Sequence, residues 1–226
     1  MRIFGYELEM VALDYDGVIV KFTTVIRDTL IETGQQYGLP QENVIQYMTY
    51  LGTPKWAPNL LAGIKCVWPE VDDSLVPEIA LTFRQLEKST NFEPKGQSIE
   101  AIRQMLGMGL KVGLCTANDD NSLALRLRCV GLEASEFTGI NRIGSKFCKP
   151  HPQALHDLFE VCEVAPNKAL YVGDWEADLT LAREADVRFV AITTPPLMDV
   201  DYFQARGVPE DHIIHCLSGL VAKIEQ

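Results

Sequence analysis

Two aspartates, Asp14 and Asp16, follow an apolar run and are followed at once by Gly17. The run from Glu9 to Asp14 predicts a buried strand, and carboxylates two residues apart at its end would point the same way. Such a pair can bind a hard cation through oxygen and can divide nucleophilic attack from proton transfer. Because Asp and Gly are also favoured turn residues, the motif alone is compatible with a plain turn.

A hydroxyl side chain ends a second predicted strand, where Thr116 is followed by Ala117 and Asn118. A hydroxyl and the backbone N–H groups that open a helix can together hold an anion such as phosphate. The alternative is a helix cap, in which Thr116, Asn118 or Asp119 accepts the first N–H groups of the helix. Taken alone, this motif favours the cap.

Two further motifs follow at later boundaries between elements. Lys149-Pro150 precedes a predicted helix, and Gly173-Asp174 ends a strand, with Asp178 four residues on. A lysine is a compact cation that can neutralise phosphate or crowded carboxylates, although a lysine before a helix is usually a surface charge. Asp174 and Asp178 could supply metal ligands, or they could cap a helix and favour its first turn.

The segments that carry these motifs alternate between strand and helix patterns. Apolar runs predict strands at residues 9–14, 111–115, 169–172, 188–192 and 213–214. Helical periodicity predicts helices at residues 98–108, 122–130, 152–162, 177–185 and 217–224. Ser98 is the expected N-cap of the first of these helices. The alternation predicts an α/β fold with a doubly wound, parallel, Rossmann-like sheet and a site at the carboxyl ends of its strands.

The stretch between the first two motifs has a different character. Apolar residues recur there at helical spacing, and Pro54, Pro58 and Pro69 punctuate it. We therefore expect an inserted helical domain of about four helices at residues 21–91. Residues 1–20 and 92–226 would form the α/β core.

Composition narrows the classes of partner. The 226 residues include 31 Asp and Glu against 20 Lys and Arg, a formal net charge of −11, so nucleic acid is an unexpected partner. Apolar runs are too short to span a bilayer, and no secretory signal is visible. We expect a cytoplasmic protein that is a monomer or a homodimer and does not associate with a membrane.

The order of the motifs is more informative than any single one. An acid pair, a hydroxyl, a lysine and a second acid pair each fall at a strand or helix boundary of one parallel sheet. Together they would supply a nucleophile, a proton donor, metal ligands and a cation for phosphate, as phosphoryl transfer through an aspartyl-phosphate requires.

This set of motifs resembles the haloacid dehalogenase-like hydrolase superfamily. The residues that carry the resemblance are Asp14-x-Asp16-Gly17, Thr116, Lys149-Pro150 and Gly173-Asp174-x-x-x-Asp178. The helical insertion after the first motif is similar to that of the helical-cap branch, which includes phosphoglycolate phosphatase and β-phosphoglucomutase. One departure is that Asn118 stands one position later than the usual asparagine, where Ala117 is found instead.

The resemblance implies a role for each residue of the motifs. Asp14 would attack phosphorus, and Asp16 would protonate the leaving group and then activate water. Mg²⁺ would be held by Asp14, the backbone carbonyl of Asp16 and Asp174. Asp178 would ligate through a water or orient Lys149. The phosphoryl group would be bound by Thr116, Ala117, Asn118 and Lys149.

The helical insertion would close over the site as a lid and set specificity, with Lys55 and Trp56 as candidate substrate contacts. Each has a simpler interpretation, as a surface charge or as a packed core ring. The expected substrate is a small phosphorylated metabolite. Phosphoryl transfer within a sugar phosphate, and a catalytically silent binding protein of the same fold, remain as alternatives.

Overall fold

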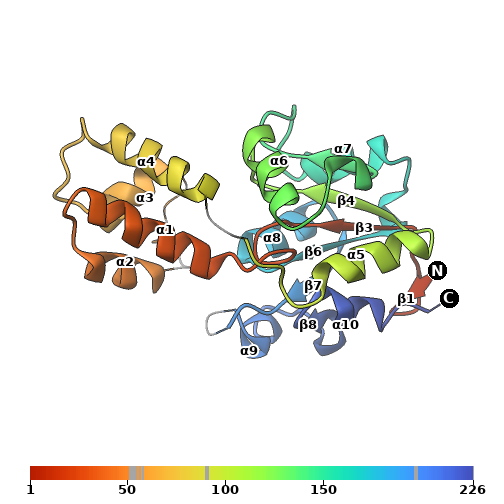
Figure 1. The fold of residues 1–226 in the computed structure, drawn as a ribbon. Coiled ribbons are helices and arrows are strands. Elements are labelled where there is room, and N and C mark those ends of the chain that lie inside the picture. Colours follow the sequence, from red (N-terminus) through yellow and green to blue (C-terminus); the bar gives the residue numbers. More distant parts are fainter. Residues whose placement is uncertain (51–54, 56, 58, 90–91, 196–197, 226) are drawn as a thin grey trace. The chain divides into compact units, whose positions relative to one another are not determined.

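A six-stranded parallel sheet lies at the centre of the larger part of the chain (Figure 1). The computed structural model describes residues 1–50, 55, 57, 59–89, 92–195 and 198–225. The strands stand in the order β5-β4-β3-β6-β7-β8, with bounds β3 Met10–Leu13, β4 Lys111–Cys115, β5 Gly139–Asn141, β6 Ala169–Gly173, β7 Arg188–Ile192 and β8 Ile213–Ile214. Strand β3 pairs with β4 on one side and β6 on the other. The strands that precede Asp14, Thr116 and Asp174 are therefore neighbours.

Helices cover both faces of this sheet, which explains why its central strands are apolar on both sides. The helices of this part are α5 Ser98–Gly107, α6 Asp120–Cys129, α7 Gln153–Val161, α8 Glu176–Glu184, α9 Val200–Gln204 and α10 Leu217–Val221. Side chains from α7, α8 and α9 share one core with alternate strand residues, including Met10, Ala12 and Tyr171. Helices α5 and α10 pack together on the other face (Figure 1). The predicted doubly wound parallel fold is confirmed.

Three local features differ from the sequence prediction. Ser98 is not the N-cap of α5: Gln97 holds that position, and the buried Ser98 hydroxyl donates to the carbonyl oxygen of Ile19 at 2.7 Å. Strand β5 was not expected, because its three residues form a strand only through pairing with β4. An N-terminal antiparallel pair, β1 Arg2–Ile3 and β2 Tyr6–Glu7, is also too short to show periodicity.

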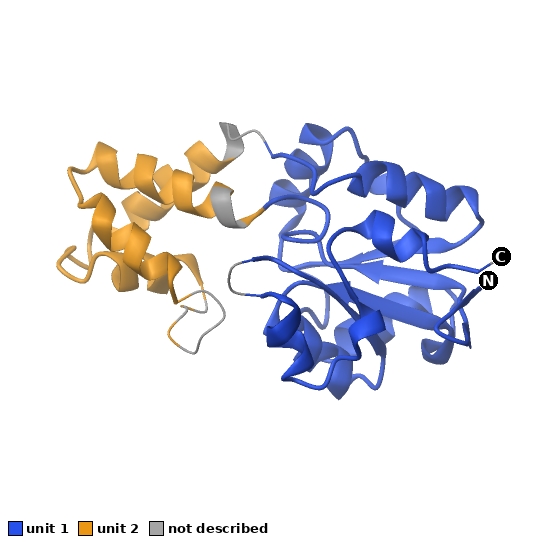
Figure 2. Ribbon diagram, turned by 90° about the horizontal axis from the view of Figure 1, so that it is seen from below, with its two compact units in different colours: residues 1–21, 92–226 blue, residues 22–91 orange. Residues whose placement is uncertain are grey.

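The chain divides into two compact units (Figure 2). Unit 1 comprises residues 1–21 and 92–226, and unit 2 comprises residues 22–91. The described helices of unit 2 are α1 Thr23–Gln36, α2 Gln41–Met48, α3 Leu60–Val67 and α4 Val76–Ser89. They enclose a separate core that includes Val44, Ile64 and Trp68, and the Trp68 ring nitrogen donates to the Pro40 carbonyl at 3.0 Å. Each unit therefore has its own hydrophobic core.

Lys21 belongs to unit 1, one residue later than the expected boundary. Its backbone N–H donates to the Glu93 carbonyl at 2.9 Å, and its ammonium contacts the Glu93 carboxylate at 2.8 Å. These contacts join the two chain segments of unit 1 at the point where unit 2 is inserted.

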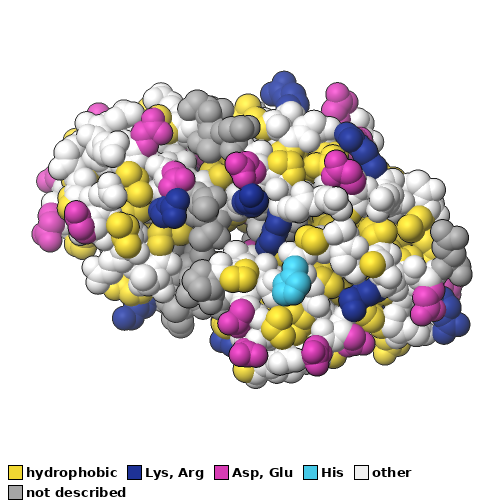
Figure 3. Space-filling model, turned by 60° about the horizontal axis from the view of Figure 1, so that its bottom comes forward, with side chains coloured by type: hydrophobic (Ala, Val, Ile, Leu, Met, Phe, Trp, Pro, Cys, Tyr) yellow, Lys and Arg dark blue, Asp and Glu magenta, His cyan; other side chains and the backbone are white. Residues whose placement is uncertain are grey.

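On the molecular face shown in Figure 3, acidic and basic side chains are interspersed. Among the described residues, no helix is both long enough and apolar enough to cross a membrane.

Candidate active site

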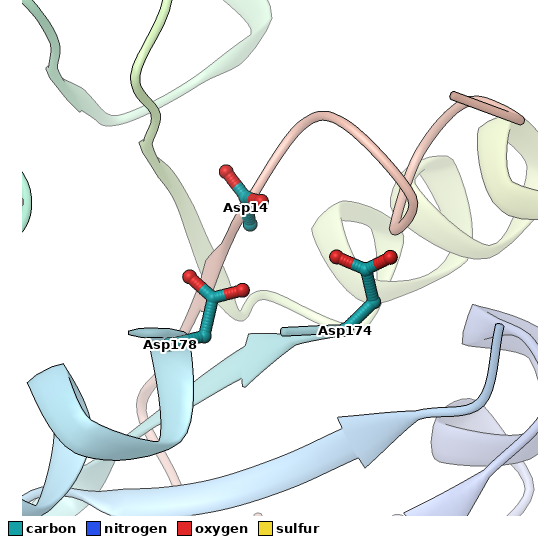
Figure 4. Close-up of side chains that lie close together, drawn as sticks. All are labelled: Asp14, Asp174 and Asp178. Carbon is teal, nitrogen blue, oxygen red and sulfur yellow. The ribbon is translucent and has the colours of Figure 1, made fainter. Parts of the chain in front are cut away.

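Three buried aspartates meet at the carboxyl ends of two neighbouring strands (Figure 4). Asp14 follows β3, Asp174 follows β6, and Asp178 lies in the first turn of α8. One carboxylate oxygen from each lies within 4.8 Å of the others. Parallel pairing of β3 with β6 brings Asp14 beside Asp174, and a single turn of α8 brings Asp178 back toward both. Three residues separated by up to 164 positions thus form one acidic cluster.

Lys149 is the cation of this cluster. Its Nζ lies 3.0 Å from Oδ1 of Asp14 and 2.5 Å from Oδ1 of Asp178, and its side chain is only 11% exposed. The hydroxyl of Tyr171, a buried residue of β6, also donates to Oδ1 of Asp178 at 2.7 Å. The lysine is therefore held between two carboxylates, and Asp178 is itself fixed by a tyrosine.

Burial governs the electrostatics of the cluster. It raises the pKa of Asp14 well above its ordinary value, against the opposing charge of Lys149, and the neighbouring carboxylates raise that pKa further. Burial likewise raises the pKa of Asp174 to about 7, with a further contribution from Asp178. For Lys149, burial alone lowers the pKa, but Asp14 and Asp178 outweigh it and raise the pKa above its ordinary value. Negative charge therefore exceeds what one lysine neutralises.

The donor set of this cluster fits a hard divalent cation. All three side chains present carboxylate oxygens, which are the ligands that Mg²⁺ prefers. Burying several negative charges together costs free energy unless a cation compensates them. The raised pKa values of Asp14 and Asp174 show that their charged forms are disfavoured in this cluster. Asp14, Asp174 and Asp178 are the residues that could hold such an ion.

The second aspartate of the first motif, Asp16, lies in a different set of contacts. Its Oδ2 accepts a hydrogen bond from Nδ2 of Asn118 at 2.8 Å, and its Oδ1 lies 2.5 Å from Nη1 of Arg126. The Asp16 side chain is 18% exposed. Both of its oxygens are therefore held by residues of unit 1.

Thr116, Ala117 and Asn118 occupy distinct positions after β4. Thr116 is fully buried, and its Oγ1 accepts hydrogen bonds from the Asn118 backbone and side chain at 3.2 and 2.8 Å. Ala117 is exposed, whereas Asn118 is buried. The N-cap of α6 is Asp119, whose carboxylate accepts from the Ser122 N–H at 2.8 Å, so the cap and the motif are separate features.

A second lysine, the half-buried Lys95, contacts the loop after Asp14 and the end of β7. Nζ of Lys95 donates to the carbonyl oxygens of Gly17 and Thr193 at 2.5 and 2.9 Å, and contacts Oγ1 of Thr194 at 2.9 Å. Thr194 in turn donates to Oδ2 of Asp174 at 2.9 Å. Lys95 thus ties the loop after Asp14 to the end of β7 and, through Thr194, to Asp174.

Of the two candidate substrate contacts in the helical unit, the structure describes Lys55. Lys55 is exposed, and its Nζ lies 5.1 Å from the centre of the Tyr50 ring within unit 2. Trp56 lies outside the described residues.

Sequence reasoning did not select Lys95, Arg126, Tyr171 or Thr194. Lys95, Arg126 and Thr194 each contact a motif residue at least 20 positions away in the chain, and no helix or strand spacing connects such pairs. One signal was available for Tyr171, a residue with a polar group inside an otherwise apolar strand.

A doubly wound sheet, carboxylates at the ends of adjacent strands and an inserted helical unit place the chain in the α/β class of proteins. Residues 8–186 match the family model described as haloacid dehalogenase-like hydrolase. The chain belongs to this family of hydrolases, as the motifs predicted.

Several known proteins resemble the chain at low identity. Pyrophosphatase PpaX from Bacillus cereus (strain G9842) is 22% identical over 189 residues, which cover 82% of this chain and 83% of that protein. A predicted phosphoglycolate phosphatase from Haemophilus somnus 129PT has a TM-score of 0.77 at 16% identity, over 95% of this chain and 97% of that one. A mutant of CbbY from Rhodobacter sphaeroides, in complex with xylulose-(1,5)bisphosphate, has a TM-score of 0.68 at 15% identity, over 97% of this chain and 100% of that one. The two structural matches show a shared fold.

Proposed function

We propose that this protein is a Mg²⁺-dependent phosphatase that hydrolyses a small phosphomonoester through an aspartyl-phosphate on Asp14. The observation that carries the proposal is the position of Lys149, whose ammonium lies between the carboxylates of Asp14 and Asp178. A dianionic substrate would otherwise be repelled by the carboxylate that must attack it, and a fixed cation relieves that repulsion. The relatives named as phosphatases support the same class of reaction.

In the first step, a carboxylate oxygen of Asp14 attacks phosphorus and the bond from phosphorus to the ester oxygen breaks. Asp16 gives a proton to the departing oxygen, and Lys149 balances charge on the phosphoryl group. In the second step, water attacks phosphorus and Asp16 takes a proton from the water. The bond from phosphorus to the Asp14 oxygen breaks, which frees inorganic phosphate and regenerates the Asp14 carboxylate. Thr116 and Ala117 would bind the phosphoryl group from the end of β4, whereas the side-chain amide of Asn118 donates to Asp16 and Thr116 instead.

Mg²⁺, when bound, would supply positive charge at the phosphoryl oxygens. Asp14, the backbone carbonyl of Asp16 and Asp174 would hold it, with Asp178 ligating through a water or orienting Lys149. The contact of Asp178 with Lys149 favours the second of these roles.

The test is phosphate release from p-nitrophenyl phosphate and a panel of metabolite phosphomonoesters, with pyrophosphate included because of the PpaX relative. Wild type is compared with Asp14→Asn, with Mg²⁺ and with chelator. Turnover that requires Mg²⁺ and disappears in Asp14→Asn is the expected result. Conversion of a sugar phosphate to its isomer without phosphate release would favour the mutase instead. Folded protein that binds Mg²⁺ but turns over nothing would favour a silent binder.

A further inference from the structure

Arg126 is a buried arginine that forms an ion pair with Asp16. It lies on α6, its side chain is 4% exposed, and its Nη1 approaches Oδ1 of Asp16 at 2.5 Å. The guanidinium carbon also lies 4.9 Å from the centre of the buried Phe92 ring. An arginine is almost never fully buried unless it is paired, and a cation held over an aromatic face loses mobility. The position of this guanidinium is therefore fixed by the core of unit 1.

Asn118 is the second residue that fixes the Asp16 carboxylate. Its Nδ2 donates to Oδ2 of Asp16 at 2.8 Å and to Oγ1 of Thr116 at 2.8 Å, so the amide is anchored to the end of β4. Arg126 and Asn118 thus contact different oxygens of one carboxylate. Two donors on two oxygens determine both the direction and the rotation of that group.

The exposure of the pair is asymmetric. The Asp16 side chain is 18% exposed, while that of Arg126 is 4% exposed. Arg126 therefore approaches from the protein side, and solvent reaches Asp16 from elsewhere. A purely stabilising pair is a weak explanation, because a buried ion pair is often no more stable than apolar residues of similar volume.

We propose that Arg126 is a positioning residue, which fixes the carboxylate of Asp16 for proton transfer and does not itself touch the substrate. The proposal rests on the proposed function for the role of Asp16. Its geometric part, that Arg126 determines where the Asp16 carboxylate lies, stands independently of turnover.

The test compares Arg126→Met, Arg126→Lys and wild type in pre-steady-state hydrolysis of p-nitrophenyl phosphate with Mg²⁺. p-Nitrophenolate leaves readily without a proton, so formation of the aspartyl-phosphate needs little from Asp16, whereas its hydrolysis needs a base. In Arg126→Met we expect the first phase at the wild-type rate and the second phase slower by about 10–100-fold. Arg126→Lys, which keeps one donor, should have an intermediate second phase.

Arg128→Met is the matched control, because Arg128 lies on the same helix, is exposed and contacts the Ala124 carbonyl of that helix. Its two phases should match those of wild type. Equal slowing of both phases in folded Arg126→Met, or an unchanged second phase, would overturn the proposal. If Arg126→Met does not fold, the two phases of Arg126→Lys are compared with those of wild type by the same criteria.

A crystal structure of Arg126→Met, or of Arg126→Lys if the first does not fold, separates this inference from the proposed function. The Asp16 carboxylate is expected to leave its present position beside Asn118. An unmoved carboxylate would overturn the inference even in an active enzyme. If wild type shows no turnover, the proposed function is wrong. Displacement of the Asp16 carboxylate in the Arg126 variant would still establish that Arg126 determines its position.

Discussion

At the scale of single residues, the site is governed by an imbalance of buried charge. The carboxylates of Asp14, Asp174 and Asp178 lie close together. The ammonium of Lys149 contacts Asp14 and Asp178. Asp174 is supported instead by the hydroxyl of Thr194, with Lys95 behind it. The described cations therefore compensate the cluster's negative charge only in part, which costs stability and which a bound cation would offset.

This imbalance predicts how stability depends on pH. The pKa of Asp174 is about 7 in the folded chain against an ordinary value of 3.8, so the folded state binds more protons than the unfolded state between these values. The contribution is fully present below about pH 4 and is lost as pH rises through about 7. In metal-free protein, Asp174 alone should lower the free energy of unfolding over this window by at most about 1.4 kcal/mol per pH unit.

Urea unfolding in chelator at several pH values measures this slope. Asp174→Asn, which removes one titrating group, should make it shallower, and Asp199→Asn is the control because Asp199 caps helix α9 and is not one of the three clustered aspartates. Mg²⁺ should stabilise wild type more at pH 8 than at pH 6, since the ion binds the deprotonated carboxylates. A slope that is unchanged in Asp174→Asn would contradict the assignment.

At the scale of elements, the loop between β3 and the insertion is shaped by the aspartate it faces. Gly17 has a φ of +78°, and a Cβ at this position would lie 1.8 Å from Oδ2 of Asp174. The glycine is therefore required twice, for its left-handed backbone and for the space that the Asp174 carboxylate occupies. Its carbonyl also accepts from Lys95, which joins the loop to β7.

Gly17→Ala should consequently displace Asp174 and weaken Mg²⁺ binding. Gly109→Ala is the matched control, because Gly109 has a φ of +87° and open space around the missing Cβ. It should cost about 1–2 kcal/mol of stability from backbone strain alone, with Mg²⁺ affinity unchanged. Gly17→Ala should cost more and lower Mg²⁺ affinity at least about tenfold, on the scale seen when groups that orient metal ligands are altered. Calorimetric titration measures the affinity, and equal Mg²⁺ affinity in the two variants would refute the argument.

At the scale of the whole molecule, the two units have separate cores and unit 2 is inserted at one point of unit 1. The segments that flank the insertion are already joined inside unit 1. The Lys21 N–H donates to Glu93 at 2.9 Å, and the Lys95 N–H donates to Ile19 at 2.8 Å. Closing the chain across this point requires only a short connection.

We therefore expect a shortened chain, with residues 22–91 replaced by a short Gly-Ser linker, to fold and to bind Mg²⁺. Its loop-closure entropy is small, and the acidic cluster lies wholly within unit 1. If unit 2 supplies substrate contacts and excludes water, turnover of p-nitrophenyl phosphate should persist at a reduced level while discrimination among metabolite phosphates is lost. Circular dichroism, Mg²⁺ titration and the substrate panel measure these properties. Unchanged substrate preference would show that specificity lies in unit 1.

The sequence by itself determined the fold class and the family, because both depend on local patterns. Apolar runs and helical periodicity reveal strands and helices, and the boundary positions of Asp14, Thr116, Lys149 and Asp174 follow from those elements. Even the helical character of residues 22–91 is visible as spacing. Short strands such as β5 were missed because three residues show no periodicity and pair only in the folded sheet.

Tertiary structure alone decided what supports the motif residues. Arg126 is 110 positions from Asp16, and Lys95 is 99 positions from Thr194, so no local pattern connects either pair. The same holds for Ser98, whose type and position predicted a cap but whose hydroxyl contacts Ile19. A side chain's partner depends on which elements the fold brings together, whereas its secondary structure depends largely on near neighbours. The sequence therefore shows which residues could do chemistry, and only the fold shows which groups hold them in place.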